Sequence, residues 1–302
     1  MQSNQSSLRL KFPMLTILTF AVALGFVQRA HAFTFTTINN ADGFPGFMAE
    51  GINGKDEIVG SSVGTRGGQC FLRDAKGAYT ALNVPGASSC QGSGINDLGQ
   101  IVGFFFSNGI NPHGFLRDSK GGFTTIDVPG AIGGTQAFGI NSSGEITGQF
   151  FDVGGVHGFL RDTKGAFSVI NIATSTSVSG INDSGEFVGT IQGSSGIQGY
   201  LRDKNGTVTP FSDPGGFLTQ ANAINNSGEI VGFFRFAIIP GFNIDQGFLR
   251  DTKGNFTTIS VPGSLHTQAL GINAAGKIVG WYNDSNGVHG FLATRATRRG
   301  RP

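Results

Sequence analysis

The ten residues GINDLGQIVG, from Gly94 to Gly103, set a pattern that the chain repeats five more times with small changes. The other copies are GINGKDEIVG from Gly51, GINSSGEITG from Gly139, GINDSGEFVG from Gly180, AINNSGEIVG from Ala223 and GINAAGKIVG from Gly271. The asparagine of the motif falls at positions 53, 96, 141, 182, 225 and 273, so successive copies are 41 to 48 residues apart. A period of this length is typical of propeller blades and solenoid units.

A second motif accompanies each copy and divides the repeat into four short strands. It reads CFLRD from Cys70, GFLRD from Gly114, Gly158 and Gly247, GYLRD from Gly199 and GFLAT from Gly290. We expect strands of the types 135–140, 145–150, 159–161 and 123–128 in each repeat, with an Asn-x-x-Gly turn after the first and an Asp-x-Lys-Gly turn after the third. Four antiparallel strands per repeat predict a blade, whereas a β-helix rung would be about half as long. The predicted fold is therefore all-β, a six-bladed β-propeller of four-stranded antiparallel blades.

The two ends of the repeat region predict how the ring closes. After Gly290-Phe291-Leu292 the chain has no further turn motif and no fourth strand, whereas residues 35–38 read FTTI, as residues 256–259 do. We therefore expect the strand at 35–38 to complete the sixth blade as its outermost strand, which leaves only short, protected sheet edges.

The composition excludes several other classes. The 302 residues include 50 Gly and 28 Phe but only 13% charged residues. Gly has no period of three, which excludes collagen, and the aromatic content is too high for a disordered chain. A mainly helical protein would not tolerate so much Gly, because each interior Gly costs about 1 kcal/mol relative to Ala.

The segments outside the repeats have their own signatures. Residues 1–32 predict a signal peptide, with Arg9 and Lys11 before an apolar run and a small-x-small site ending at Ala32; the alternative is a buried apolar helix. The repeats then occupy 33–292, and 293–302 predict a basic disordered tail. Residues 33–292 hold 14 basic and all 19 acidic residues, a net charge of −5, which argues against nucleic-acid binding. After cleavage we expect no integral membrane segment, and we expect an exported monomer, extracellular or periplasmic.

The repeat resembles a known family. The unit HGFLRDTKGAFSVI together with GINDSGEFVG is similar to the bacterial extracellular HAF repeats, named for a His-Ala-Phe motif that here reads His-Gly-Phe at His113, His157 and His289. In other units the triplet departs from the family pattern and begins with Gln. The likeness covers nearly all of residues 33–292. It implies an exported propeller and supplies no catalytic residues.

Cys70 and Cys90 are the two cysteines of the chain, and both lie near one repeat boundary. Cys70 opens a predicted third strand, and Cys90 lies in the predicted crossover after the fourth. The start of one strand of an antiparallel hairpin lies beside the end of the next, so a disulfide is expected in an exported protein. The alternative is a pair of free buried thiols.

Positions that break the repeat are the candidate binding sites. Repeat five has 15 positions between Gly232 and Gly247, whereas four other repeats have 10 or 11. The extra residues predict an apolar partner-binding loop, or one that folds back on its own blade: Phe234, Arg235, Phe236, Ile238, Ile239 and Phe242. Four glutamines begin equivalent first strands and predict a ring around the central channel, or simple strand-end hydrogen bonding: Gln91, Gln136, Gln220 and Gln268.

Residues that recur in every unit are interpreted as structural. This applies to the arginine and aspartate of the Leu-Arg-Asp motif, to the turn asparagine, and to histidines that blade symmetry spreads around the ring. Dispersed carboxylates could meet in a cleft, namely Asp152, Asp213, Asp245 and Asp284. The sequence predicts no catalytic, cofactor or metal residues. It favours a non-enzymatic binding or scaffold protein that recognises a protein or glycan through loops on one face. The alternative is an extracellular hydrolase or lyase acting on carbohydrate.

Overall fold

The computed structural model describes residues 33–39, 46–62, 68–193, 196–239 and 241–296, and these residues form one compact unit. The predicted signal peptide, residues 1–32, lies outside the described residues. Within the described part of the chain, no helix is long and apolar enough to cross a membrane.

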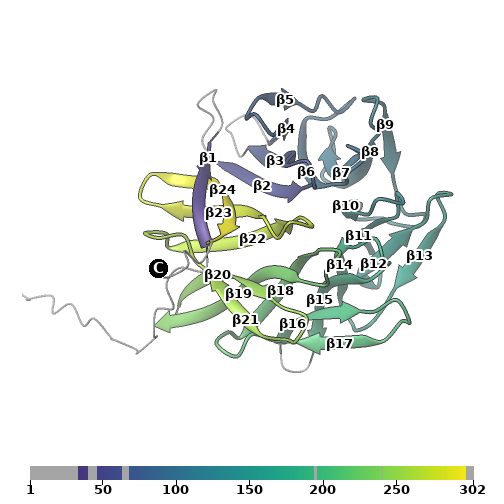
Figure 1. The fold of residues 1–302 in the computed structure, drawn as a ribbon. Helices are drawn as coiled ribbons and strands as arrows, with labels where there is room; N and C mark the ends of the chain where they lie inside the picture. Colours follow the sequence, from purple (N-terminus) through teal and green to yellow (C-terminus); the bar gives the residue numbers. More distant parts are fainter. Residues whose placement is uncertain (1–32, 40–45, 63–67, 194–195, 240, 297–302) are drawn as a thin grey trace, which may run out of the picture. The chain divides into compact units, whose positions relative to one another are not determined.

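The described residues form six antiparallel sheets of four strands, arranged in a ring (Figure 1). Residues of the innermost strand of each sheet line a central channel. The first blade comprises β2 (Phe47–Ile52), β3 (Ile58–Ser62), β4 (Gln69–Arg73) and β5 (Tyr79–Ala81). The second comprises β6 (Ser89–Ile95), β7 (Ile101–Phe106), β8 (Pro112–Arg117) and β9 (Phe123–Ile126). The third comprises β10 (Thr135–Ile140), β11 (Ile146–Asp152), β12 (Gly155–Arg161) and β13 (Phe167–Ile170). The fourth comprises β14 (Thr176–Ile181), β15 (Phe187–Gly193), β16 (Gly196–Arg202) and β17 (Val208–Phe211). The fifth comprises β18 (Leu218–Ile224), β19 (Ile230–Ile239), β20 (Phe242–Arg250) and β21 (Phe256–Ile259). The sixth comprises β22 (His266–Ile272), β23 (Ile278–Asp284), β24 (Gly287–Arg295) and β1 (Phe33–Ile38). This confirms the predicted six-bladed propeller.

The first strand of the described residues closes the ring, as predicted. β1 is the outermost strand of the sixth blade and pairs antiparallel with β24, from Phe33 opposite Arg295 to Ile38 opposite Gly290 (Figure 1). β24 therefore continues to Arg295, beyond the repeat boundary at 292 that the sequence suggested, because β1 supplies hydrogen-bond partners for these extra residues. Residues 297–302 of the predicted tail lie outside the described part.

The topology gives the propeller two different faces. We call the first strand of each blade, which lines the channel, the inner strand, and the face on which these strands begin the crossover face. The loops between second and third strands and the connections between blades also lie on the crossover face. On the turn face, the Asn-x-x-Gly and Asp-x-Lys-Gly turns join the strands. Gly144 shows why the first turn needs glycine, since its φ is +88°.

Apolar side chains between neighbouring blades form the core. One cluster joins Val102 of β7 to Ile126, Ala137, Ile146 and Phe159 of the next strands along the chain. The glycine that ends the repeat motif permits close approach of the strands: a Cβ on Gly148 would lie 2.0 Å from the Gln136 carbonyl oxygen. These glycines therefore allow each second strand to lie tightly against its inner strand.

The six motif asparagines form a closed hydrogen-bonded ring on the turn face. Each is buried, and its Nδ2 donates to the backbone carbonyl of the motif asparagine in the next blade, from Asn53 to Asn96 and finally from Asn273 back to Asn53. In Asn96, Oδ1 also accepts from the backbone amides of Leu98 and Gln100. The repeated asparagine thus shapes its own turn and joins adjacent blades.

Candidate functional site

The central channel opens on the crossover face into a cavity of about 310 Å³. Its lining comes from the inner strands of all six blades and from two second strands: Met48, Glu50, Gln91, Ser93, Phe138, Gln149, Ser177, Ser179, Gln220, Asn222, Gln268, Leu270 and Trp281. We call this cavity the channel mouth. Its size is at the lower end of the range for small-ligand sites.

A β-bulge in every inner strand supplies the innermost ring of the channel mouth. The register shifts by one residue in each inner strand, and the extra residue contributes to the channel wall. These bulge residues are Glu50, Ser93, Phe138, Ser179, Asn222 and Leu270. Bulges commonly re-aim side chains next to functional sites. They lie immediately before the motif that begins Gly-Ile-Asn, where the sequence differs in nearly every repeat, so the repeat pattern did not mark them as candidate site residues.

Glu50 differs chemically from the other five bulge residues. Of the described residues that line the channel mouth, Glu50 alone carries an ionisable side chain. Burial within the channel raises the pKa of Glu50 from 4.5 to about 7, and a hydrogen bond with Ser61 opposes part of this increase. The site therefore contains a carboxyl group that changes its charge near neutral pH.

The predicted glutamine ring lies around the outer part of the channel mouth. Gln91, Gln220 and Gln268 line the cavity. Gln136 accepts a hydrogen bond from Gln149, and Gln149 lines the cavity. Met48 and Ser177 occupy the corresponding positions in the remaining two blades. The ring is thus formed by amides in four blades and interrupted in two.

One polar network connects the channel mouth to blade five. Asp245 is buried, and its carboxylate accepts from Arg235 Nε at 2.6 Å, from Arg235 Nη2 at 3.0 Å and from Gln268 Nε2 at 2.7 Å. The Asp245 backbone amide donates to His266 Nδ1 at 3.2 Å. Burial opposes ionisation of Asp245, but hydrogen bonds from Arg235 and Gln268 outweigh it and hold its pKa below the ordinary value. The charges of Asp245 and Arg235 therefore compensate each other, and the Asp245 carboxylate holds the Gln268 side chain in position.

The insertion in repeat five is an extended hairpin rather than the loop we expected. β19 and β20 pair from Ile230 to the tip, where Ile239 lies opposite Phe242. The predicted residues divide into two groups. Phe234 is buried and Phe236 packs against the core, whereas Ile238, Ile239 and Phe242 remain 52%, 61% and 42% exposed. The stem folds back on its blade, and the tip presents an apolar surface.

The four dispersed carboxylates do not meet in one cleft. Asp152 and Asp284 accept from His157 and His289 within their own second-to-third strand hairpins. Asp213 accepts from the Gly215 amide, and Asp245 belongs to the network with Arg235. Among the residues that the structure describes, no group of three His, Cys, Asp or Glu side chains could hold a metal ion.

The Leu-Arg-Asp motif has a structural explanation in this chain. Asp118 Oδ1 accepts from the amides of Lys120 and Gly122, which closes the turn. Four of the arginines lie over aromatic rings, as Arg250 does over Phe211 at 4.8 Å.

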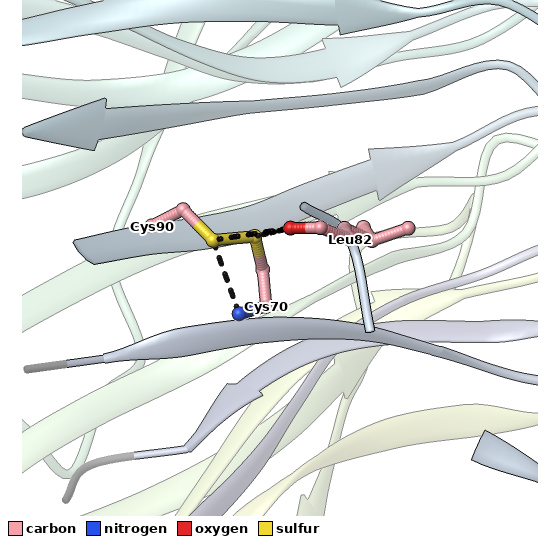
Figure 2. Close-up of a disulfide and its surroundings, with 3 residues drawn as sticks. All are labelled: Cys70, Leu82 and Cys90. Atoms are coloured by element: carbon pink, nitrogen blue, oxygen red, sulfur yellow. Dashed lines mark hydrogen bonds between the residues drawn. A yellow bond between two sulfur atoms is a disulfide. The ribbon is translucent and has the colours of Figure 1, made fainter. Parts of the chain in front are cut away.

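Cys70 and Cys90 form a disulfide with a Cα–Cα distance of 5.4 Å, as predicted (Figure 2). Cys90 lies in β6, the inner strand of the second blade, rather than in the crossover, so the bond joins two blades. Figure 2 also shows the Cys70 amide directed at Cys90 Sγ, 3.1 Å away, with the Leu82 carbonyl beside the two sulfurs. A disulfide indicates an oxidising compartment.

The fold and its channel mouth place the chain among β-propellers with a small-molecule-sized central cavity. No family model matches the sequence, and no curated protein does. Solved structures similar to this chain include a streptogramin B lyase, at 13% identity and TM-score 0.50 over 87% of this chain and 98% of the other. A virginiamycin B lyase from Staphylococcus aureus matches at 15% identity and TM-score 0.51, over 88% and 90%. A gluconolactonase from Xanthomonas campestris matches at 12% identity and TM-score 0.54, over 87% and 89%. At these identities the likeness establishes the fold alone.

Proposed function

We propose that the protein is an exported, non-enzymatic β-propeller that binds a glycan in its channel mouth. The observation that supports this proposal is the contrast between the two faces. The turn face is built from asparagines that recur in every blade, whereas the bulge residues on the other side differ between blades. Residues needed for the ring recur, and residues that recognise a ligand do not have to.

The chemistry of the channel mouth suits a sugar. Side-chain amides of Gln91, Gln220 and Asn222 can both donate to and accept from hydroxyl groups. Trp281 from the second strand of blade six adds an aromatic surface on which the apolar face of a sugar ring can pack. Polar groups of both kinds around an aromatic side chain favour a neutral or weakly charged polyol over an extended apolar ligand.

Binding fits this lining better than turnover does. Glycoside hydrolysis typically uses a pair of carboxyl groups flanking the scissile bond. The described residues of the channel mouth contribute one, Glu50. The alternative function, a hydrolase or lyase acting on carbohydrate, would require a second acid or base in this cavity.

A glycan array followed by calorimetry tests the proposal. Wild-type protein is screened first, and each hit is then titrated into Trp281→Ala and Gln220→Ala variants. We expect both variants to bind at least tenfold more weakly, a loss of about 1.4 kcal/mol. Leu98→Ala, on the exposed turn face, is the matched control and should bind as wild type does. Unchanged affinity in the two channel variants would refute the assignment.

The hairpin tip supports a second candidate, contact with a protein partner. Ile238, Ile239 and Phe242 are exposed together at one tip. Because Phe234 and Arg235 are held in the stem, replacing the three tip residues by Ser leaves the blade intact. Loss of a captured protein from the serine variant, with unchanged glycan binding, would support this second role, and capture by both forms would reject it.

Export and family membership complete the proposal. The disulfide and the predicted cleavage after Ala32, directly before β1, support an exported protein. The His-Gly-Phe triplets support membership of the HAF repeats. Mass spectrometry of the protein recovered outside the cytoplasm should find a mature chain that begins at Phe33. Size-exclusion chromatography should find a monomer.

A further inference from the structure

Among the described residues of the channel wall, none carries a charge that compensates Glu50. The bulge residues that face it from the neighbouring inner strands are neutral: Ser93, Phe138, Ser179, Asn222 and Leu270. Ser61, on its own blade, is neutral as well. In the described part of the chain, the charged and titratable groups next to the cavity are Arg235, Asp245 and His266, and both Arg235 and His266 contact Asp245.

An ionised carboxylate in such an enclosed position is unfavourable unless a positive group pairs with it. The neighbouring bulge residue offers a further unfilled contact. Ser93 Oγ is buried and has no hydrogen-bond partner among the described residues. β2 and β6 touch at this level, where the Ser93 carbonyl lies 2.8 Å from a Cβ built on Gly51. Glu50 and Ser93 therefore belong to adjacent parts of one wall. Among the described residues, the Glu50 carboxyl group has a hydrogen bond with Ser61 but no charged partner, and Ser93 Oγ has no hydrogen-bond partner.

We propose that the channel mouth binds a ligand that carries a positively charged ammonium group, with this group seated between Glu50 and Ser93. The inference rests on the proposed function and specifies its ligand as an amino sugar. The ammonium donates to the Glu50 carboxylate and to Ser93 Oγ. Trp281 and Phe138 line the same cavity and offer aromatic faces that attract a cation.

The cavity also limits the ligand. At about 310 Å³ it accommodates one or two sugar rings, so a longer chain must extend onto the crossover face. Acetylation of the amino group removes the positive charge and adds bulk at the end that enters the channel. The structure therefore predicts discrimination between an amino sugar and its N-acetylated form.

Calorimetry with two matched disaccharides tests this inference: the glucosamine disaccharide and its di-N-acetylated counterpart. Wild-type protein should bind the amine at least about 30-fold more tightly, the size of effect found when one partner of a buried charge pair is removed. Glu50→Gln should abolish the preference, and Ser93→Ala should reduce it. Thermal unfolding of each variant checks that the ring is intact.

Tetramethylammonium separates charge from sugar recognition, because its charge does not titrate. Its affinity for wild-type protein should rise between pH 6 and 8 as Glu50 ionises, and its affinity for Glu50→Gln should stay constant. Equal binding of the two disaccharides, or a preference that survives Glu50→Gln, would overturn the inference while leaving glycan binding in place. If no glycan binds the channel mouth at all, the proposed function fails as well.

Discussion

Replacing one asparagine of the turn-face ring by alanine should destabilise the whole propeller. In Asn96→Ala four hydrogen bonds are lost: two backbone amides donate to Oδ1, and Nδ2 donates to Gln100 Oε1 and to the Asn141 carbonyl. A typical intramolecular hydrogen bond contributes about 1 kcal/mol net, so the upper figure is about 4 kcal/mol. The backbone amides of Leu98 and Gln100 can form hydrogen bonds with water instead, which recovers part of this free energy. The expected loss in the free energy of unfolding is therefore about 3 kcal/mol.

Thermal and urea unfolding measure this change. A loss of about 3 kcal/mol corresponds to a fall in Tm of roughly 6–12 °C for a domain of this size. Asn83→Ala, at an exposed asparagine, is the control and should change stability by less than about 0.5 kcal/mol. A shift for Asn96→Ala no larger than that of the control would show that the ring of hydrogen bonds contributes nothing to closure. That result would refute the reasoning.

Three further changes have expected outcomes. Replacing Cys70 and Cys90 by Ala should cost roughly 3 kcal/mol by loop entropy, seen as a lower urea midpoint that matches reduced wild type. Because the pKa of Glu50 is raised in the folded state, wild-type stability should fall as pH rises from 4.5 through about 7. Glu50→Gln should remove this fall, of roughly 3 kcal/mol, from the free energy of unfolding measured by urea titration at each pH. Gly148→Ala puts a methyl group 2.0 Å from a carbonyl oxygen and should prevent folding, as judged by circular dichroism, whereas Gly130→Ala meets nothing within 4 Å and should cost only about 1 kcal/mol.

The repeat made most of the fold predictable. Strands 135–140 and the closure by residues 35–38 followed from copies of the same letters, because a residue needed by every blade recurs in every blade. The end of β24 was less predictable. Its last residues are ordered by pairing with β1, a contact between distant parts of the chain that local patterning does not encode.

The candidate site was predictable only in part. The glutamines begin inner strands and were found from their shared offset, but Glu50 was missed. Glu50 lies two residues after Met48, which holds the place of the glutamines in its blade, so alternation along the strand puts both side chains on the channel side. The position was missed because it carries a different residue in nearly every repeat, so no shared letter marks it. Likewise, the pairing of Arg235 with Asp245 depends on the length of a hairpin that we had expected to be a loop.

The pairing of β1 with β24 has a consequence for how the molecule reaches its native state. Thr34 and Thr294 lie 260 positions apart in sequence, yet their hydroxyl groups are hydrogen-bonded. Contacts of such separation form slowly, because a long loop must be closed before they contribute free energy. Five blades can form from consecutive strands, whereas the sixth blade is complete only when β1 pairs with β24. Synthesis from one end to the other thus leaves the first strand without its partner until the final strand has emerged, and a circular permutant that links the two strands directly should fold faster without a change in architecture.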